Sequence, residues 1–120
     1  MIVGIGIDVV GLERFAGAVS RPGVAERLFA PDERAAAEGM SPDRAIEYLA
    51  GRFAAKEALA KALGAPAGLA WTHVCVTTGR PQLELTGTAA AWAEELGVTA
   101  SHVSITHDAG VAAAVVVLEG

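Results

Sequence analysis

The feature that most constrains this chain is a long helical segment, residues 42–63, with a carboxylate on its apolar side. Ser41 suits the N-cap, a proline follows at the first helical position, and Gly64 suits the left-handed residue that ends a helix. Apolar residues recur at helical spacing along the segment, and Glu57 lies only about 20° from their stripe. Acidic side chains are rarely buried without a partner, so Glu57 needs one.

The residues alone allow two interpretations of Glu57. Lys61 lies four residues later, in the order that favours an ion pair along a helix, worth about 0.2–0.5 kcal/mol. Alternatively, Glu57 is an oxygen ligand in a metal or phosphate site, and Lys61 faces the same negatively charged substrate. Helical spacing does not choose between these interpretations.

The composition indicates a single globular domain covering residues 1–120. Apolar residues make up 52% of the chain and charged residues 19%, which excludes disorder. No apolar run approaches the ~20 residues of a transmembrane helix, and the first residues lack the basic region of a signal peptide, so we expect a cytoplasmic protein. The single cysteine, Cys75, excludes an internal disulfide and is expected to be a buried structural thiol.

The charge is distributed unevenly along the chain. The net charge of −5 argues against general nucleic-acid binding. Every Lys and Arg except Arg80 lies between Arg14 and Lys61, in a half that also holds many acidic residues. That half therefore either presents a local basic face, with Arg14 and Arg21 near one side of a helix, or carries ordinary surface salt bridges.

The pattern of the whole chain predicts an α+β fold. Residues 2–8, 72–78, 82–86, 102–107 and 111–118 are typical of strands, and short helices are expected at 11–19, 31–39 and 87–96 in addition to the long one. This order predicts a single domain with a largely antiparallel sheet and one long helix.

The first strand has one side almost without side chains. Three apolar residues point one way, whereas Gly4, Gly6 and Asp8 point the other way. Glycine inside a strand often marks close approach by a ligand or by another stretch of backbone. Asp8 is then either part of a site or the N-cap of the next helix.

Three polar clusters stand out against the Ala and Val background. They are Asp8, the group of Glu57 with Lys56 and Lys61, and residues 104–108. Two carboxylates with lysines fit a magnesium-dependent phosphate site, because Mg²⁺ takes one or two carboxylates and leans on substrate phosphates. The sequence contains no zinc-type His/Cys cluster, no Walker loop and no nucleophile elbow.

These clusters carry a resemblance to a known family. Gly-Ile-Gly-Ile-Asp at 4–8, Arg-Phe-Ala-Ala-Lys-Glu-Ala-Leu-Ala-Lys-Ala-Leu-Gly at 52–64 and His-Val-Ser-Ile-Thr-His at 102–107 resemble the signature blocks of the holo-[acyl-carrier-protein] synthases, the small 4′-phosphopantetheinyl transferases. The Gly-Arg-Pro turn at 79–81 is similar to a turn of the same family. The blocks occur in order over nearly the whole chain.

The resemblance implies an activity and a set of site residues. The expected reaction moves 4′-phosphopantetheine from coenzyme A to a serine of an apo acyl carrier protein, with Mg²⁺, and releases adenosine 3′,5′-bisphosphate. Asp8 and Glu57 match the metal ligands. The implied catalytic residues are Asp8, Glu57, Lys61, His107 and Asp108. The implied coenzyme A-binding residues are Arg52, Lys56, Lys61, Gly64, Gly79, Arg80, Pro81, Ser104 and His107, and the carrier-binding residues are Arg14 and Arg21.

The resemblance further implies a homotrimer with sites between subunits, a place in fatty acid biosynthesis and lipid metabolism, and no nucleic-acid or membrane partner. The residues do not say whether Glu57 accepts the serine proton directly or whether another base acts through water on the metal. Two other functions stay open. A magnesium-dependent phosphohydrolase would use the same carboxylates with water as acceptor, and a non-catalytic trimeric binding module would use them only as structural groups.

Overall fold

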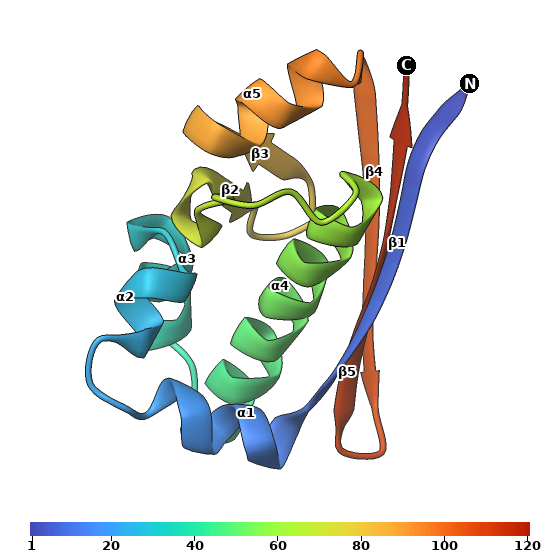
Figure 1. Ribbon diagram of the computed structural model, residues 1–120. Coiled ribbons are helices and arrows are strands. Elements are labelled where there is room, and N and C mark those ends of the chain that lie inside the picture. The colour runs from blue at the N-terminus through green and yellow to red at the C-terminus, as the bar shows by residue number, and fades with distance from the viewer.

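A computed structural model describes residues 1–120 (Figure 1). The elements, in chain order, are β1 (Ile2–Gly11), α1 (Leu12–Val19), α2 (Val24–Leu28), α3 (Pro31–Glu38), α4 (Pro42–Ala62), the 3₁₀ turn η1 (Trp71–His73), β2 (Val74–Val76), β3 (Leu83–Leu85), α5 (Gly87–Glu95), β4 (Ala100–Asp108) and β5 (Val111–Glu119).

The long strands form one antiparallel sheet in the order β1-β5-β4, and β2 pairs with β3 in a separate antiparallel hairpin. Helix α4 crosses one face of the three-stranded sheet, and the other helices and the hairpin lie on that same side (Figure 1). The predicted α+β class, with a largely antiparallel sheet and one long helix, is confirmed. None of the helices combines the length and the apolar character of a membrane-spanning segment.

Local signals set both ends of α4. The Ser41 hydroxyl accepts a hydrogen bond from a backbone N–H of the first turn, at 3.4 Å, and a proline fills the first helical position. At the other end Gly64 has φ +87°, and the N–H of Ala65 donates to the carbonyl of Ala60 at 2.7 Å. This is the hydrogen bond of a Schellman ending, which needs a residue that tolerates positive φ.

Strand β1 packs its glycine side directly onto α4. A Cβ atom at Gly4 would overlap the carbonyl of Ala62, and one at Gly6 would overlap the carbonyl of Ala58. The close approach predicted for this strand is therefore an approach to the backbone of α4. The strand and the helix lie too near each other for any side chain between them, so their relative position is tightly fixed.

The opposite side of β1 is apolar and exposed. Ile5, Ile7 and Val9 have 64%, 64% and 61% of their surface accessible. They lie beside Val117 and Val115 of β5 on the face of the sheet that no element of this chain covers (Figure 1). Together these five side chains form what we call the outer strip.

Three sequence expectations change in detail. Strand β1 continues to Gly11, which is itself the N-cap position of α1, so the alternative role of Asp8 as a helix cap is wrong. Residues 72 and 73, expected to begin a strand, belong instead to the 3₁₀ turn of residues 71–73, and the hairpin strands are shorter than predicted. Cys75 is free and half-buried on β2, and burial raises the pKa of its thiol, in keeping with a structural role.

Candidate functional site

The first site contact joins β1 to α4. Asp8 points to the α4 side of its strand, as Gly4 and Gly6 do, and the Lys61 ammonium donates to its carboxylate at 3.0 Å and to the Ile7 carbonyl at 3.0 Å. The Asp8 side chain is 18% exposed and that of Lys61 is 53% exposed. The helical ion pair between Glu57 and Lys61, one of the two interpretations that the sequence allows, is not formed, because the ammonium turns to the strand.

Glu57 completes the cluster from one turn earlier on α4. Its side chain is half-buried, and burial raises the pKa of its carboxyl, with the nearby Asp8 charge adding to the rise and Lys61 opposing it. Two carboxylates and one ammonium therefore share a partly buried place between β1 and the C-terminal half of α4. Lys61 offsets only one of the two negative charges, so the cluster keeps a net negative charge that a bound cation would compensate.

The donor set of this cluster suits Mg²⁺. No group of three or more His, Cys, Asp or Glu side chains gathers anywhere in the chain, so the protein offers no all-protein metal cage. Asp8 and Glu57 nevertheless supply the one or two carboxylates that Mg²⁺ usually takes, leaving its other positions to water and substrate phosphate. The raised pKa of Glu57 gives a physical reason why a cation would be favoured there.

His107 lies on the same face of the sheet but near the other end of α4. Its Nδ1 is 3.1 Å from Oε2 of Glu47. Glu47 and Glu57 are ten residues apart on the helix, which corresponds to about 15 Å. Within one chain, therefore, His107 does not join the Asp8–Glu57–Lys61 cluster.

Ser104 and Asp108 lie on the other face of the sheet. Ser104 is opposite Val115 and Asp108 is opposite Val111 in the register of β4 with β5, so both project beside the outer strip. Both residues are exposed. The predicted nucleotide-side residues of β4 are thus divided between the two faces, and neither of these two meets Asp8 in the same chain.

Two exposed turns hold other predicted coenzyme A-binding residues. Gly79, Arg80 and Pro81 form the tip between β2 and β3, where the Thr77 hydroxyl donates to the Arg80 carbonyl at 3.2 Å. Gly64 is exposed at the end of α4, about two turns beyond Glu57 and one turn beyond Lys61.

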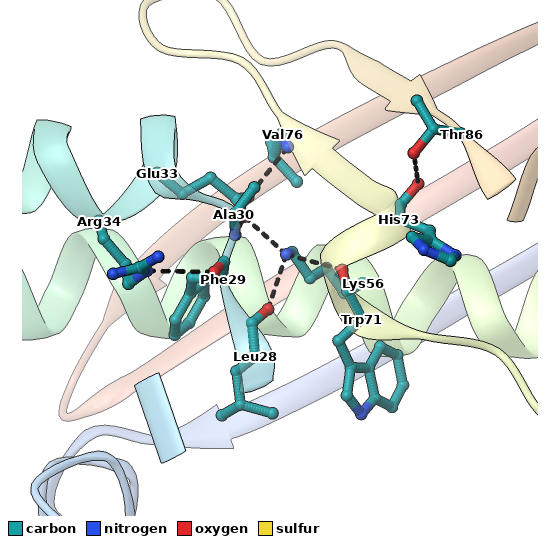
Figure 2. A network of polar contacts seen from close by, with 10 residues as sticks. All are labelled: Leu28, Phe29, Ala30, Glu33, Arg34, Lys56, Trp71, His73, Val76 and Thr86. Carbon is teal, nitrogen blue, oxygen red and sulfur yellow. Dashed lines mark hydrogen bonds and ion pairs between the residues drawn. The ribbon is translucent and has the colours of Figure 1, made fainter. Parts of the chain in front are cut away.

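Arg52 and Lys56 do not join the cluster and instead hold other parts of the chain. A terminal nitrogen of Arg52 donates to the Thr77 carbonyl at 3.0 Å, and its guanidinium lies 4.0 Å from the ring centre of Tyr48. The Lys56 side chain has no exposed surface and forms an ion pair with Glu33 at 2.6 Å (Figure 2). Because the Lys56 ammonium is bonded entirely to acceptors inside the protein, Lys56 is not assigned the direct contact with coenzyme A that the sequence predicts.

Arg14 lies on α1, and Arg21 lies two residues beyond the last residue of that helix, Val19. Both are exposed, and both line an open hollow of about 820 Å³ between α1 and the β4–β5 turn. Glu13 lines the hollow as well, so the three charged side chains together carry a net positive charge, which favours an acidic partner.

Two carboxylates that pair with predicted site residues were not predicted from the sequence. Glu33, in the first turn of α3, is the buried partner of Lys56, and Glu47 lies beside His107. A signal for Glu33 existed, because a lysine at the inward side of an apolar helix requires a carboxylate somewhere in the chain.

Comparison with known proteins identifies the class to which this fold and site belong. Residues 4–116 match the family described as the 4′-phosphopantetheinyl transferase superfamily. The chain belongs to this superfamily, as its three sequence blocks suggested.

Relatives of the chain within that superfamily include several holo-[acyl-carrier-protein] synthases. The chain is 56% identical to a holo-[acyl-carrier-protein] synthase of Streptomyces coelicolor, with 99% of this chain and 98% of the relative covered. Its fold is similar to the crystal structure of holo-[acyl-carrier-protein] synthase from Neisseria meningitidis, with a TM-score of 0.85, 32% identity and all of both chains covered. It is also similar, with a TM-score of 0.81, 36% identity and coverage of 98% and 96%, to a holo-(acyl-carrier-protein) synthase from Bacillus anthracis solved in complex with CoA (3′,5′-ADP).

Proposed function

We propose that this protein is a holo-[acyl-carrier-protein] synthase, which transfers 4′-phosphopantetheine from coenzyme A to a serine of an apo acyl carrier protein. The structural observation that carries the proposal is the cluster of Asp8, Glu57 and Lys61, which two separate elements bring together at a partly buried position. The full-length similarity to holo-[acyl-carrier-protein] synthases supports the same activity.

Asp8 and Glu57 would hold Mg²⁺, and the ion, when bound, supplies positive charge that offsets the charge of the pyrophosphate. Lys61 has more than half of its side chain exposed, so its ammonium can turn from Asp8 to a phosphate oxygen. Once there, it stabilises the charge that develops on the leaving group in the transition state.

The transfer forms one phosphorus–oxygen bond and breaks another. The serine oxygen attacks the phosphorus that carries pantetheine, and the oxygen that bridges to the nucleotide leaves with adenosine 3′,5′-bisphosphate. The serine proton must pass to a base. Glu57 is a candidate to accept it, because its half-buried carboxyl lies in the same cluster as Lys61, which faces the phosphate in this proposal.

The nucleotide part of coenzyme A is assigned to residues away from the cluster. We place it between the turn of Gly79, Arg80 and Pro81, which belongs to the chain that supplies Glu57 and Lys61, and the residues His107, Ser104 and Asp108, in keeping with the family blocks. Because His107 and the Asp8 cluster lie at different ends of α4 in one chain, a second copy is the natural source of the missing side. Both proposed substrates belong to the cytoplasm, which is where we place the reaction.

The outer strip supports assembly with further copies of the chain. Exposed β-branched side chains in a row on an edge strand are a hazard for a lone protein and usually mark a surface that is covered. We assign this surface to a homotrimer, in which the Asp8 side and the His107 side of one site come from neighbouring subunits. The number three follows the family resemblance.

The carrier is assigned to the hollow beside α1. Arg14 on α1 and Arg21 just beyond its end line this hollow next to the β4–β5 turn. We expect the acyl carrier protein to be acidic. The local positive charge of the hollow would then steer association, although the net charge of the whole enzyme is −5.

Mass spectrometry of an apo carrier protein incubated with coenzyme A, Mg²⁺ and the enzyme tests the activity. We expect a mass gain equal to one phosphopantetheine and release of adenosine 3′,5′-bisphosphate. Cleavage of coenzyme A without a gain on the carrier would instead indicate the phosphohydrolase. The absence of both cleavage and coenzyme A binding would indicate the non-catalytic binding module.

A mixing experiment tests whether the site is shared. Asp8→Ala and His107→Ala chains, each expected to be inactive alone, are dissociated together and allowed to reassociate. Because Asp8 and Glu57 lie close together in one chain, the complementing residue must come from the His107 side. We expect partial recovery of transfer, since some interfaces then combine the intact cluster of one chain with the intact His107 of its neighbour. No recovery, with mixed assemblies verified by native mass spectrometry, would place His107 and the cluster of each site in one subunit.

A further inference from the structure

The side of α4 that faces away from β1 carries a buried ion pair whose role the reaction does not yet explain. Lys56 has no exposed surface, and its ammonium donates to Oε1 of Glu33 at 2.6 Å, to the Leu28 carbonyl at 2.7 Å and to the Trp71 carbonyl at 3.0 Å (Figure 2). A lysine has three N–H donors, so all of them are used.

Glu33 is equally committed. It is 1% exposed, its Oε1 also accepts from the N–H of Ala30 at 2.9 Å, and its Oε2 accepts from the N–H of Val76 at 3.0 Å (Figure 2). The pair therefore connects the end of α2, the start of α3, η1 and β2 to the middle of α4. Apart from the bond between the two side chains, all of these hydrogen bonds go to backbone atoms of short or irregular segments.

The β2–β3 hairpin is held in place by this connection together with the burial of Val74 and Val76 in the main core. Its two strands have three residues each and pair only with one another, and a two-stranded hairpin of this size is not stable alone. The structure fixes it to α4 through Val76 and Glu33, through Trp71 and Lys56, and through Thr77, whose carbonyl accepts from Arg52 at 3.0 Å.

A buried ion pair does not by itself mean stability. Apolar residues of similar volume often fill such a place equally well or better. They offer no hydrogen bond, however, to the Trp71 carbonyl or the Val76 N–H, so they would not set the position of the hairpin. What this pair adds over an apolar filling is a defined geometry.

We propose that Lys56 and Glu33 are positioning residues for coenzyme A, which hold the Gly79–Arg80–Pro81 turn at a fixed place relative to Glu57 and Lys61. The inference rests on the proposed function, because that function makes the turn part of the coenzyme A site. Lys56 is adjacent to Glu57 on α4 and points about 100° away, so one helix carries both the cluster and the anchor of the turn.

The test compares the wild type with a paired apolar variant, Glu33→Leu with Lys56→Met, which removes both charges together. Coenzyme A binding with Mg²⁺ is measured by calorimetry, and KM is measured for coenzyme A and for the carrier. We expect the variant to bind coenzyme A about ten to a hundred times more weakly, the effect typical of removing groups that support site ligands. The KM for the carrier should change much less.

Amide hydrogen exchange supplies a readout that needs no substrate. In the variant, the Val76 amide should lose its protection, whereas the amides of β5 should keep theirs. The matched control is Val116→Ala, a cavity in the main core away from the pair; it should lower the thermal midpoint and leave the affinity for coenzyme A unchanged. A purely structural pair would instead give the variant and the control the same behaviour.

Wild-type affinity for coenzyme A in a folded paired variant would overturn the proposal. If the paired variant does not fold, Glu33→Gln, which keeps the shape of the side chain, carries the same expectation with a smaller loss, and unchanged affinity there would also overturn it. Failure of the wild type to bind coenzyme A would refute the proposed function instead, and exchange at Val76 would still report whether the pair anchors the hairpin.

Discussion

Two lysines of α4, five residues apart, show how differently one helix uses the same side chain. Lys56 is fully buried with every donor on a fixed acceptor, whereas Lys61 is 53% exposed and bonded only to β1. The buried lysine cannot reach a ligand, and the exposed one is free to exchange its partner. The function of each lysine therefore depends more on the side of α4 from which it projects than on its residue type.

The same contrast extends to the carboxylates. Glu33 is paired with Lys56 and accepts backbone N–H groups at both oxygens, so its charge is compensated. Glu57 shares its surroundings with Asp8 and has a raised pKa. On one side of α4, therefore, the charges compensate each other within the protein. On the other side two carboxylates face one ammonium, which suits the binding of a metal ion and a phosphate group.

The largest effect should come from the incomplete side. Asp8→Ala and Glu57→Gln should each reduce transfer to the carrier by at least about 10²–10³-fold, because each removes a group that stabilises charge in the transition state. Initial rates by mass spectrometry measure the loss, and circular dichroism checks that both variants fold. Near wild-type turnover of either variant at limiting Mg²⁺ would show that the assignment of ligands is wrong.

The next effect concerns stability and separates the two lysines. Lys56→Met should lower the free energy of unfolding by about 3–5 kcal/mol, since it leaves Glu33 charged and buried without a partner. Lys61→Met should lower it by less than about 1 kcal/mol, as for an exposed pair. Urea titrations of both variants measure the difference, and equal losses would contradict the division of α4 into two sides.

A smaller effect is expected at the surface of the enzyme that we assign to carrier docking, which lies away from both lysines. Arg14→Glu should raise the KM for the carrier about tenfold, near the low end of electrostatic steering effects, and leave the KM for coenzyme A nearly unchanged. Wild-type association should also weaken as salt increases. Equal increases in both constants would remove Arg14 from the docking surface.

The smallest effect concerns the stability of the folded chain, which the charge of Glu57 beside Asp8 lowers at neutral pH. Because the pKa of Glu57 is raised in the folded chain, the folded state holds this proton more tightly than the unfolded state does. Its contribution is therefore fully present below the unfolded pKa of 4.5 and is lost as pH rises through the folded pKa. At neutral pH and without divalent ions, Glu57→Gln should have a higher thermal midpoint than the wild type.

Two further measurements check this explanation. The advantage of Glu57→Gln should disappear near pH 4, where the wild-type carboxyl is also protonated. It should shrink when Mg²⁺ is added to the wild type. A midpoint of the variant at or below that of the wild type at neutral pH would mean that Glu57 is not under electrostatic strain.

Much of this molecule follows from short-range signals in the sequence. Ser41 and Gly64 fix the ends of α4, and the alternation of the strands gives the class of the fold. The glycines of β1 correctly predict a close approach, and Asp8 and Lys61 do lie together. Each of these signals acts over a few residues or belongs to a recognisable block.

Other features depend on contacts between distant segments and were not predicted. Glu33 and Lys56 are 23 residues apart, and nothing local indicates that they meet. For the same reason Lys56 was expected at the ligand rather than inside the protein. The separation of His107 from Glu57 along α4 likewise depends on how the helix crosses the sheet, which periodicity does not contain.

The outer strip of β1 and β5 has a consequence for how this protein behaves in dilute solution. In the proposed homotrimer, covering the strip contributes to folding only when other copies are present, so the stability of each chain depends on mass action. Dilution then lowers the unfolding midpoint, and a newly made chain in a cell with few copies remains exposed for longer. The amount of protein present would thus set how much of it is folded and able to act.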